Sequence, residues 1–205
     1  MHKLILASSS PRRQQLIALL GIPFMVKPSP IDEKSLRLTG PPARQVMDSA
    51  QAKAGAAAAA MVGEGHWVLA ADTVVCVEGM ILGKPDGRDD ARRMLALLSG
   101  RAHTVFTGLC LLRKGKESPL PVFEETRVWM APLTERQMEA YIDTGEPMDK
   151  AGAYGIQGFG SAMIPRVEGC YFNVMGLPLY RTARLLEEAG IGLHSAYWKE
   201  AGYAR

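Results

Sequence analysis

Alternating segments of strand and helix character predict a single α/β or α+β domain for this chain. Apolar runs of strand length alternate with longer segments that carry helical periodicity. No internal repeat or linker interrupts this order, and a length of 205 residues suits one domain. Hydrophobic residues make up 47% and charged residues 22% of the chain, an ordinary balance with enough apolar material for a core.

The first twenty residues predict a buried strand, a hydroxyl-rich loop and a helix. Residues 4–7 are apolar, three serines follow, and Pro11 opens an amphipathic segment. Proline suits the first helical position because its missing N–H would be unpaired there, and Ser10 is a natural N-cap. The free N–H groups at such a helix start bind anions, and Arg12 and Arg13 add donors matched to phosphate. This corner predicts a phosphate site, with an ordinary turn followed by solvated arginines as the alternative.

The next part of the chain predicts a strand, a polar loop, a long helix and a buried strand. Residues 24–27 suit a short strand, and the loop 28–42 holds five prolines or glycines. Residues 43–61 are rich in alanine and contain no proline, which predicts a helix. The short apolar run 66–71 predicts a buried strand, which residues 74–77 continue.

A hairpin, a helix and two long strands are predicted after this. The dipeptide at 78–79 indicates a tight turn into a strand at 80–82. Apolar residues at helical spacing predict a helix over 89–98. Residues 104–112 and 122–131 are the longest strand candidates of the chain.

The last third predicts two helices around a glycine-rich loop. The helix at 134–143 starts with a Thr-x-x-Gln capping box. Residues 145–160 contain five glycines and indicate a structured loop, which a strand at 162–167 follows. A proline at the first helical position predicts a helix over 178–188, and residues 191–205 have the character of a tail.

Composition excludes several classes of function. The formal net charge of +3 is too small for a nucleic-acid binder, and no basic run interleaved with aromatic residues is present. The three cysteines are far apart and odd in number, which argues against a disulfide framework or a zinc site. No secretory signal and no stretch long enough to span a membrane is visible, so we expect a cytoplasmic protein without a membrane partner.

Asp72 is the strongest single candidate for a catalytic or metal-binding group. Together with Thr73 it interrupts the otherwise apolar run 67–76. A carboxylate inside a buried strand is costly unless it binds a cation or accepts hydrogen bonds. The alternative is a structural aspartate at a bulge or strand end, with its charge satisfied locally.

Three lysines accompany this carboxylate at positions where the backbone is constrained. Lys53 lies on the alanine-rich helix, Lys84 on a stiff Gly-Lys-Pro corner, and Lys150 on the glycine-rich loop. Each lysine taken alone is more often a solvated side chain. Together with Glu33 and Asp72 they suit a polyphosphate, because cations neutralise the phosphates while carboxylates hold Mg²⁺ and orient water.

Seven motifs of the chain resemble, in the same order, those of the Maf family of nucleoside triphosphate pyrophosphatases. They are S-x-S-P-R-R at 8–13, the isolated Glu33, K-A at 53–54, A-A-D-T at 70–73, G-K-P at 83–85, H-x-V-x-T-G at 103–108 and E-P-M-D-K-A-G-A-Y-G-I-Q-G at 146–158. The resemblance covers roughly residues 3–188, and the last motif is long and specific. It implies a single elongated α/β domain at residues 1–190, with a mixed sheet and a deep cleft. That architecture is similar to the one of inosine triphosphate pyrophosphatase. The resemblance also implies that the protein is often a homodimer.

The resemblance also implies a reaction and a set of site residues. A nucleoside triphosphate and water would give the monophosphate and pyrophosphate, with a divalent cation, Mg²⁺ or Mn²⁺, as cofactor. The family's proton acceptor corresponds to Asp72, which would share the metal with Glu33. The positions that contact phosphate and metal correspond to Ser8, Arg13, Glu33, Lys53, Lys84 and Lys150. The substrate-selecting positions correspond to Arg12, Thr73 and Gln157, whose residue types match the branch acting on dTTP and UTP rather than on 7-methyl-GTP.

Three functions remain open at this point. The leading one is a dTTP/UTP pyrophosphatase that sanitises the nucleotide pool. The same chemistry on modified pyrimidine nucleotides is the second. The third is a nucleotide-sensing regulator of cell division with incidental hydrolysis, because relatives are associated with septum formation.

Overall fold

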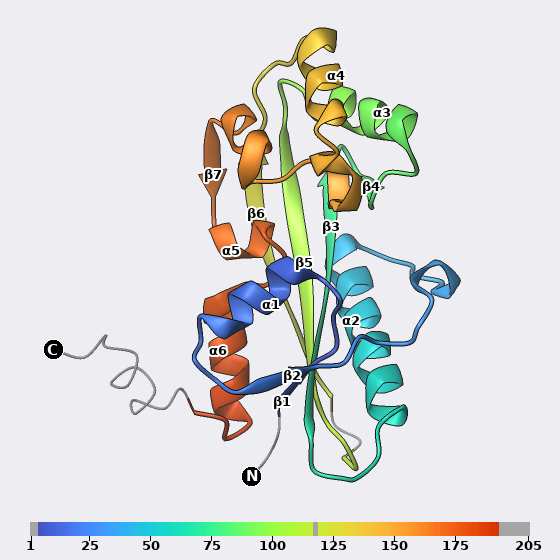
Figure 1. Cartoon of the computed structure of the whole chain (residues 1–205), viewed down its shortest axis with the longest axis vertical. Coiled ribbons are helices and arrows are strands. Elements are labelled where there is room, and N and C mark those ends of the chain that lie inside the picture. The colour runs from blue at the N-terminus through green and yellow to red at the C-terminus, as the bar shows by residue number, and fades with distance from the viewer. Residues whose placement is uncertain (1–3, 117–118, 193–205) are drawn as a thin grey trace, which may run out of the picture.

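One mixed sheet of seven strands runs through the computed structural model, which describes residues 4–116 and 119–192 (Figure 1). The strands are β1 (Leu4–Leu6), β2 (Phe24–Val26), β3 (Trp67–Val77), β4 (Met80–Leu82), β5 (Ala102–Arg113), β6 (Leu120–Trp129) and β7 (Arg166–Glu168). Their order is β2-β1-β3-β5-β6-β7, and β4 pairs with β3. Strand β1 is parallel to β2 and β3, whereas all other pairs are antiparallel. The predicted α/β class with a mixed sheet is confirmed.

Helices cover both faces of the lower half of the sheet (Figure 1). The helices are α1 (Pro11–Ala18), α2 (Pro42–Ala59), α3 (Arg88–Leu98), α4 (Glu135–Asp143), α5 (Tyr171–Val174) and α6 (Leu179–Glu188). Leu69 and Ala71 of β3 pack with α1 and α6, whereas Val68 and Ala70 pack with the alanines of α2. Successive side chains of a strand point to opposite faces, so α1 and α6 lie on one face and α2 on the other.

A third apolar cluster occupies the upper half of the face that carries α1. It contains Val75 and Val77 of β3 together with buried side chains of α3 and α4. Four short 3-10 turns complete the fold: η1 (Glu33–Ser35), η2 (Glu146–Asp149), η3 (Ala151–Ala153) and η4 (Gly158–Met163). The cluster around α1 and α6 and this upper cluster are stacked along one face of the sheet, which gives the molecule its elongated shape (Figure 1).

Local sequence signals set several helix ends as expected. The backbone N–H of Arg13 donates to the Ser10 side chain, so Ser10 caps α1. Thr134 and Gln137 form the reciprocal capping box at the start of α4. None of the helices in the described ranges is long and apolar enough to cross a membrane.

Most predicted ends lie within one or two residues of those observed, and three features differ in a way that the structure explains. The strand expected at 162–167 is Arg166–Glu168, because the glycine-rich loop continues as a 3-10 turn through Met163. Pro178 is extended and caps α6 instead of opening it, since its carbonyl accepts the first hydrogen bond of the helix, from Thr182. Strand β3 passes through Asp72 and Thr73 without a break. The predicted tail falls, from residue 193 onward, outside the described residues.

Candidate active site

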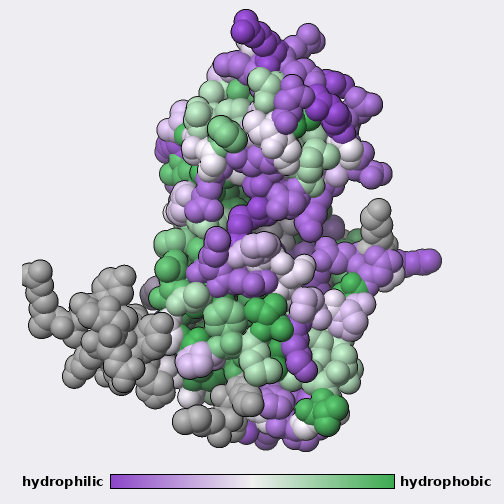
Figure 2. Space-filling model, in the orientation of Figure 1, coloured by the Kyte–Doolittle hydropathy of each residue, from purple (hydrophilic) through white to green (hydrophobic). Residues whose placement is uncertain are grey.

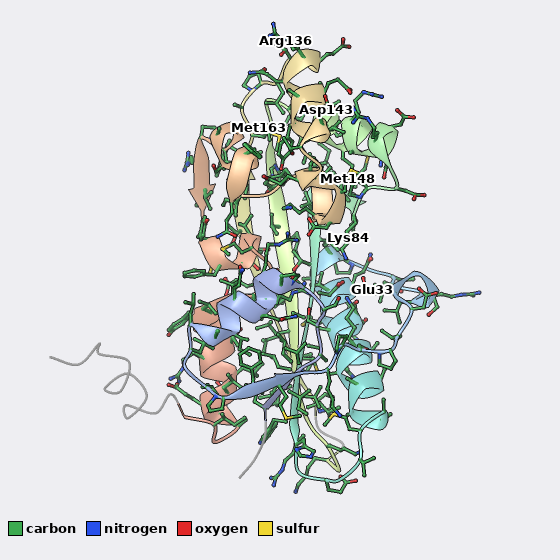
Figure 3. All side chains as sticks on the ribbon, in the orientation of Figure 1. Glu33, Lys84, Arg136, Asp143, Met148 and Met163 are labelled. Atoms are coloured by element: carbon green, nitrogen blue, oxygen red, sulfur yellow. The ribbon has the colours of Figure 1, made fainter. Side chains whose placement is uncertain are left out.

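A cleft of about 420 Å³ opens between the cluster around α1 and α6 and the upper cluster. All ten residues singled out in the sequence line it: Ser8, Arg12, Arg13, Glu33, Lys53, Asp72, Thr73, Lys84, Lys150 and Gln157. Hydrophilic side chains gather across the middle of the molecule in Figure 2, above the apolar surface over α1 and α6. Glu33 and Lys84, from distant parts of the chain, lie at the same side of the cleft (Figure 3). The volume is ordinary for a small-molecule site.

A notch in the sheet explains how Asp72 reaches this cleft from the middle of an apolar strand. On one side β3 pairs with β5 along its whole length. On the other side the ladder with β1 ends at Leu69 and the ladder with β4 begins at Val75. Asp72 and Thr73 therefore lie where β3 has no neighbour on that side within the described chain, and a ligand can approach them. The Asp72 carboxylate faces the cleft and is not enclosed in the apolar core, so the free-energy cost of its burial is low.

Lys53 of α2 joins two carboxylates at the notch. Its Nζ lies 2.6 Å from Asp72 Oδ1 and 3.0 Å from Glu33 Oε1, while its side chain is only 5% exposed. A buried ammonium is costly unless it is paired, and here two anions compensate it. The loop that carries Glu33 is thereby tied to the strand that carries Asp72.

Arg13 is held rigidly at the start of α1. Its Nε donates to the Gly176 carbonyl (2.8 Å), and Nη2 donates to Thr73 Oγ1 (2.9 Å). Ser8 Oγ lies 3.5 Å from Nη1. Burial lowers the pKa of Arg13, whereas the charges of Asp72 and Glu33 raise it. Because arginine stays protonated in proteins, the cleft contains a fixed, desolvated positive charge.

A chain of hydroxyl groups behind Arg13 was not foreseen from the sequence. Thr73 Oγ1 lies 2.9 Å from Thr107 Oγ1, which donates to the Asn173 carbonyl. The Thr107 proton is therefore used, so Thr73 donates to Thr107 and accepts from Arg13. Thr107 is the threonine of the H-x-V-x-T-G motif, which was the available signal for it, whereas nothing in the sequence pointed to Gly176.

Asp149 bridges the two halves of the molecule across the cleft. Its carboxylate accepts from Arg12 Nη1 of α1 (3.0 Å) and from Lys150 Nζ (2.7 Å). Burial alone would raise the pKa of Asp149, but the hydrogen bonds and charges of Lys150 and Arg12 lower it below its ordinary value. Arg12, predicted to select the substrate, and Lys150, predicted to contact phosphate, therefore share the Asp149 carboxylate.

The side chain of Gln157, like that of Lys84, makes no hydrogen bond to any residue of the described ranges. It is exposed on the loop between η3 and η4 and lines the cleft. Both its carbonyl oxygen and its amide nitrogen are available to a ligand.

A family model described as Maf-like protein matches residues 3–189. The chain belongs to the Maf family. A relative from Moorella thermoacetica named dTTP/UTP pyrophosphatase is 50% identical over 191 residues, which cover 93% of this chain and 97% of the relative. A relative of the same name from an Anaeromyxobacter species is 47% identical and covers 98% of this chain and 94% of its own length.

The comparison of solved structures finds a HAM1 protein from Coxiella burnetii. It superposes with a TM-score of 0.49 at 16% identity, over 98% of this chain and 96% of that chain. The resemblance to the Maf family that the motifs indicated is confirmed by the family match.

The residues of this Maf-family cleft fit a hard divalent cation that is shared with a ligand. Within the described ranges, no group of three or more His, Cys, Asp or Glu side chains could hold a metal ion by itself. Glu33 and Asp72 supply two carboxylates beside the cationic groups. Magnesium is commonly bound by one or two carboxylates, with substrate phosphates and water completing the octahedron. The donor set matches that mode of binding.

Proposed function

We propose that this Maf-family chain hydrolyses dTTP and UTP to the nucleoside monophosphate and pyrophosphate. The observation that carries the proposal is the cleft itself, in which Arg13, Lys84 and Lys150 face the same cavity as the paired carboxylates Glu33 and Asp72. The similar proteins named dTTP/UTP pyrophosphatase support the choice of substrate.

The cations and the start of α1 would bind the triphosphate. The backbone N–H groups at a helix N-terminus favour anions, and Ser8 adds a hydroxyl donor at the same corner. Arg13 is already oriented by Gly176 and Thr73, so it loses little side-chain freedom when phosphate binds. Lys84 and Lys150 supply further positive charge from the opposite half of the cleft.

Asp72 would act as the proton acceptor for the water that attacks the α-phosphorus. The new bond forms between the water oxygen and the α-phosphorus, and the bond from the α-phosphorus to the bridging oxygen breaks. Pyrophosphate leaves with the electron pair of that bond, and the water proton passes to the Asp72 carboxylate. Lys53 fixes the orientation of this carboxylate through its 2.6 Å contact. A divalent cation on Glu33 and Asp72 would withdraw charge from the phosphate oxygens.

Gln157, with Arg12 and Thr73, is our candidate for reading the base. Uracil and thymine present an N3–H donor beside the O4 acceptor, and the carboxamide of Gln157 can pair with both. Cytosine reverses this pattern and would leave polar groups unpaired, at a cost of roughly 1–3 kcal/mol each. A site built to pair with the substrate can therefore discriminate strongly between pyrimidines.

The test is a panel of nucleoside and deoxynucleoside triphosphates with Mg²⁺ or Mn²⁺, read out by pyrophosphate release. We expect UTP and dTTP to give the highest kcat/KM among the ordinary nucleotides. Faster hydrolysis of CTP or 7-methyl-GTP would overturn the assignment. Adding modified pyrimidine nucleotides identifies the preferred substrate, and tight binding of UTP without turnover would favour the sensing role. We also propose that the chain forms a homodimer, which light scattering tests. Its proposed place is the cytoplasm, where it would sanitise the nucleotide pool.

A further inference from the structure

The loop that carries Gln157 is held in place by two side chains outside the cleft. Glu146 starts η2 and Tyr141 lies on α4, and neither lines the cavity. Tyr141 Oη donates to Glu146 Oε1 at 2.8 Å, so the two side chains form one unit. The Gln157 side chain makes no hydrogen bond to the described residues, so its position depends on the backbone of the loop that carries it.

The Tyr141–Glu146 unit binds the loop on both sides of Gln157. Before it, the N–H of Gly155 donates to Tyr141 Oη (3.0 Å). After it, the N–H groups of Phe159 and Gly160 donate to the Glu146 carboxylate at 2.8 and 3.1 Å. Three backbone donors of one short loop thus converge on two side chains. The two hydrogen bonds to the Glu146 carboxylate are charge-assisted and therefore stronger than neutral ones, so they help to fix the loop in one geometry.

Glycines in the loop allow this close approach. A Cβ on Gly158 would lie 2.4 Å from Glu146 Oε2, and one on Gly160 would lie 2.8 Å from Tyr141 Oη. Gly158 also has a φ of 67°, which side chains with a Cβ rarely adopt. Burial alone would raise the pKa of Glu146, but the hydrogen bonds from Tyr141 and the two N–H groups lower it. The carboxylate is therefore ionised at neutral pH, as its three donors require.

We propose that Glu146 and Tyr141 are positioning residues that set the place of Gln157 and, through it, the choice of base. The inference rests on the proposed base-reading role of Gln157. Glu146 also fixes Lys150, whose Nζ donates to the Glu146 carbonyl at 2.5 Å, but that contact uses the backbone and survives a change of the side chain. A change at the carboxylate should therefore alter base selection more than phosphate binding.

The test is a double-mutant cycle on the ratio of kcat/KM for UTP over CTP. The variants are Tyr141→Phe, Glu146→Gln, Gln157→Ala and the two combinations with Gln157→Ala. Tyr141→Phe removes one oxygen and keeps the ring in its apolar cluster, so we expect this variant to fold even if Glu146→Gln does not. Tyr180→Phe removes the same atom from an exposed tyrosine of α6 and is the matched control.

Each single change at Tyr141 or Glu146 should lower the UTP/CTP ratio on the order of tenfold, the scale of one lost buried hydrogen bond. In the Gln157→Ala background neither change should lower it further, because the side chain they position is gone. Tyr180→Phe should leave the ratio unchanged.

The outcomes separate the two proposals. If Gln157→Ala leaves the ratio unchanged, Gln157 does not read the base and the proposed function loses that part. If Gln157→Ala lowers the ratio but Tyr141→Phe and Glu146→Gln do not, the positioning role is refuted while base reading stands. A further fall of the ratio in the combined variants would also refute it, since Glu146 would then act by another route.

Discussion

We predict that Gly108→Ala moves α2 away from β3, the strand that carries Asp72. Gly108 of β5 lies directly opposite Asp72 of β3, so both face α2. A Cβ at position 108 would lie 2.3 Å from the carbonyl carbon and oxygen of Val46, where ordinary contact begins near 3.4 Å. The obstacle is backbone, which cannot rotate away, so α2 must retreat. Lys53 lies two turns further along the same face of that helix and must retreat with it.

The size of the shift sets the size of the effect. The overlap requires α2 to move by about 1 Å, and such overpacking typically costs about 1–3 kcal/mol of stability. A misplacement of this size at a catalytic group can lower the rate on the order of 10²-fold. We therefore expect kcat for UTP to fall much more than the modest loss of stability explains, because Lys53 no longer orients Asp72.

Urea unfolding and pyrophosphate release measure the two effects separately. Gly55→Ala is the matched control, since Gly55 lies on α2 and a Cβ there meets no atom within 4 Å. It should stabilise the helix by roughly 1 kcal/mol and leave kcat unchanged. A Gly108→Ala variant with wild-type stability and wild-type kcat would refute the close approach of α2 as the basis of the Lys53–Asp72 contact.

Four further perturbations test other parts of the molecule. Asp72→Asn keeps the shape but removes the proton acceptor, so kcat should fall on the order of 10²-fold or more, and wild-type turnover in the folded variant would assign the role elsewhere. Exhaustive EDTA treatment should abolish hydrolysis and added Mg²⁺ should restore it, whereas activity that survives EDTA would rule out the metal.

Asp149→Ala frees Arg12 and Lys150, so pyrophosphate should inhibit the variant at several-fold lower concentration; unchanged inhibition would show that this carboxylate does not compete with phosphate. Burial lowers the pKa of His103 to about 4, whereas the unfolded chain protonates it near 6.5. As the pH falls from about 6.5 to 4, the unfolded chain binds a proton at His103 that the folded protein does not, so the free energy of unfolding decreases. Urea unfolding of His103→Gln should show a smaller decrease over that range.

The elements set by local physics were predictable from the sequence, and those set by distant contacts were not. Ser10 and the Thr134 capping box are decided by neighbouring backbone groups, so both were foreseen. The strand expected at 162–167 failed because the loop before it is held by Glu146, a long-range contact without a local signature. Helix α5 was missed because four residues are too few to show a helical period.

The candidate site was foreseen as a set of residue types but not as a geometry. The charge of Asp72 within an apolar strand identified it as a candidate, and the motif resemblance added the surrounding cations. That β1 ends at Leu69 and β4 begins at Val75 is a property of strand pairing, which the sequence of β3 does not contain. The partners that orient the Arg13 side chain are distant in the chain, since Thr73 lies 60 residues and the Gly176 carbonyl 163 residues away.

The notch also explains why two consecutive residues have different partners. Asp72 faces α2 and meets Lys53, while Thr73 faces α1 and meets Arg13, because neighbouring side chains of a strand point to opposite faces. A substrate that contacts both the Asp72 side and the Arg13 side would therefore lie across the edge of β3. A strand paired with β3 at that edge would block this path. The gap between β1 and β4 is thus required by the chemistry, and any insertion that extends β1 along β3 should abolish activity while leaving the sheet intact.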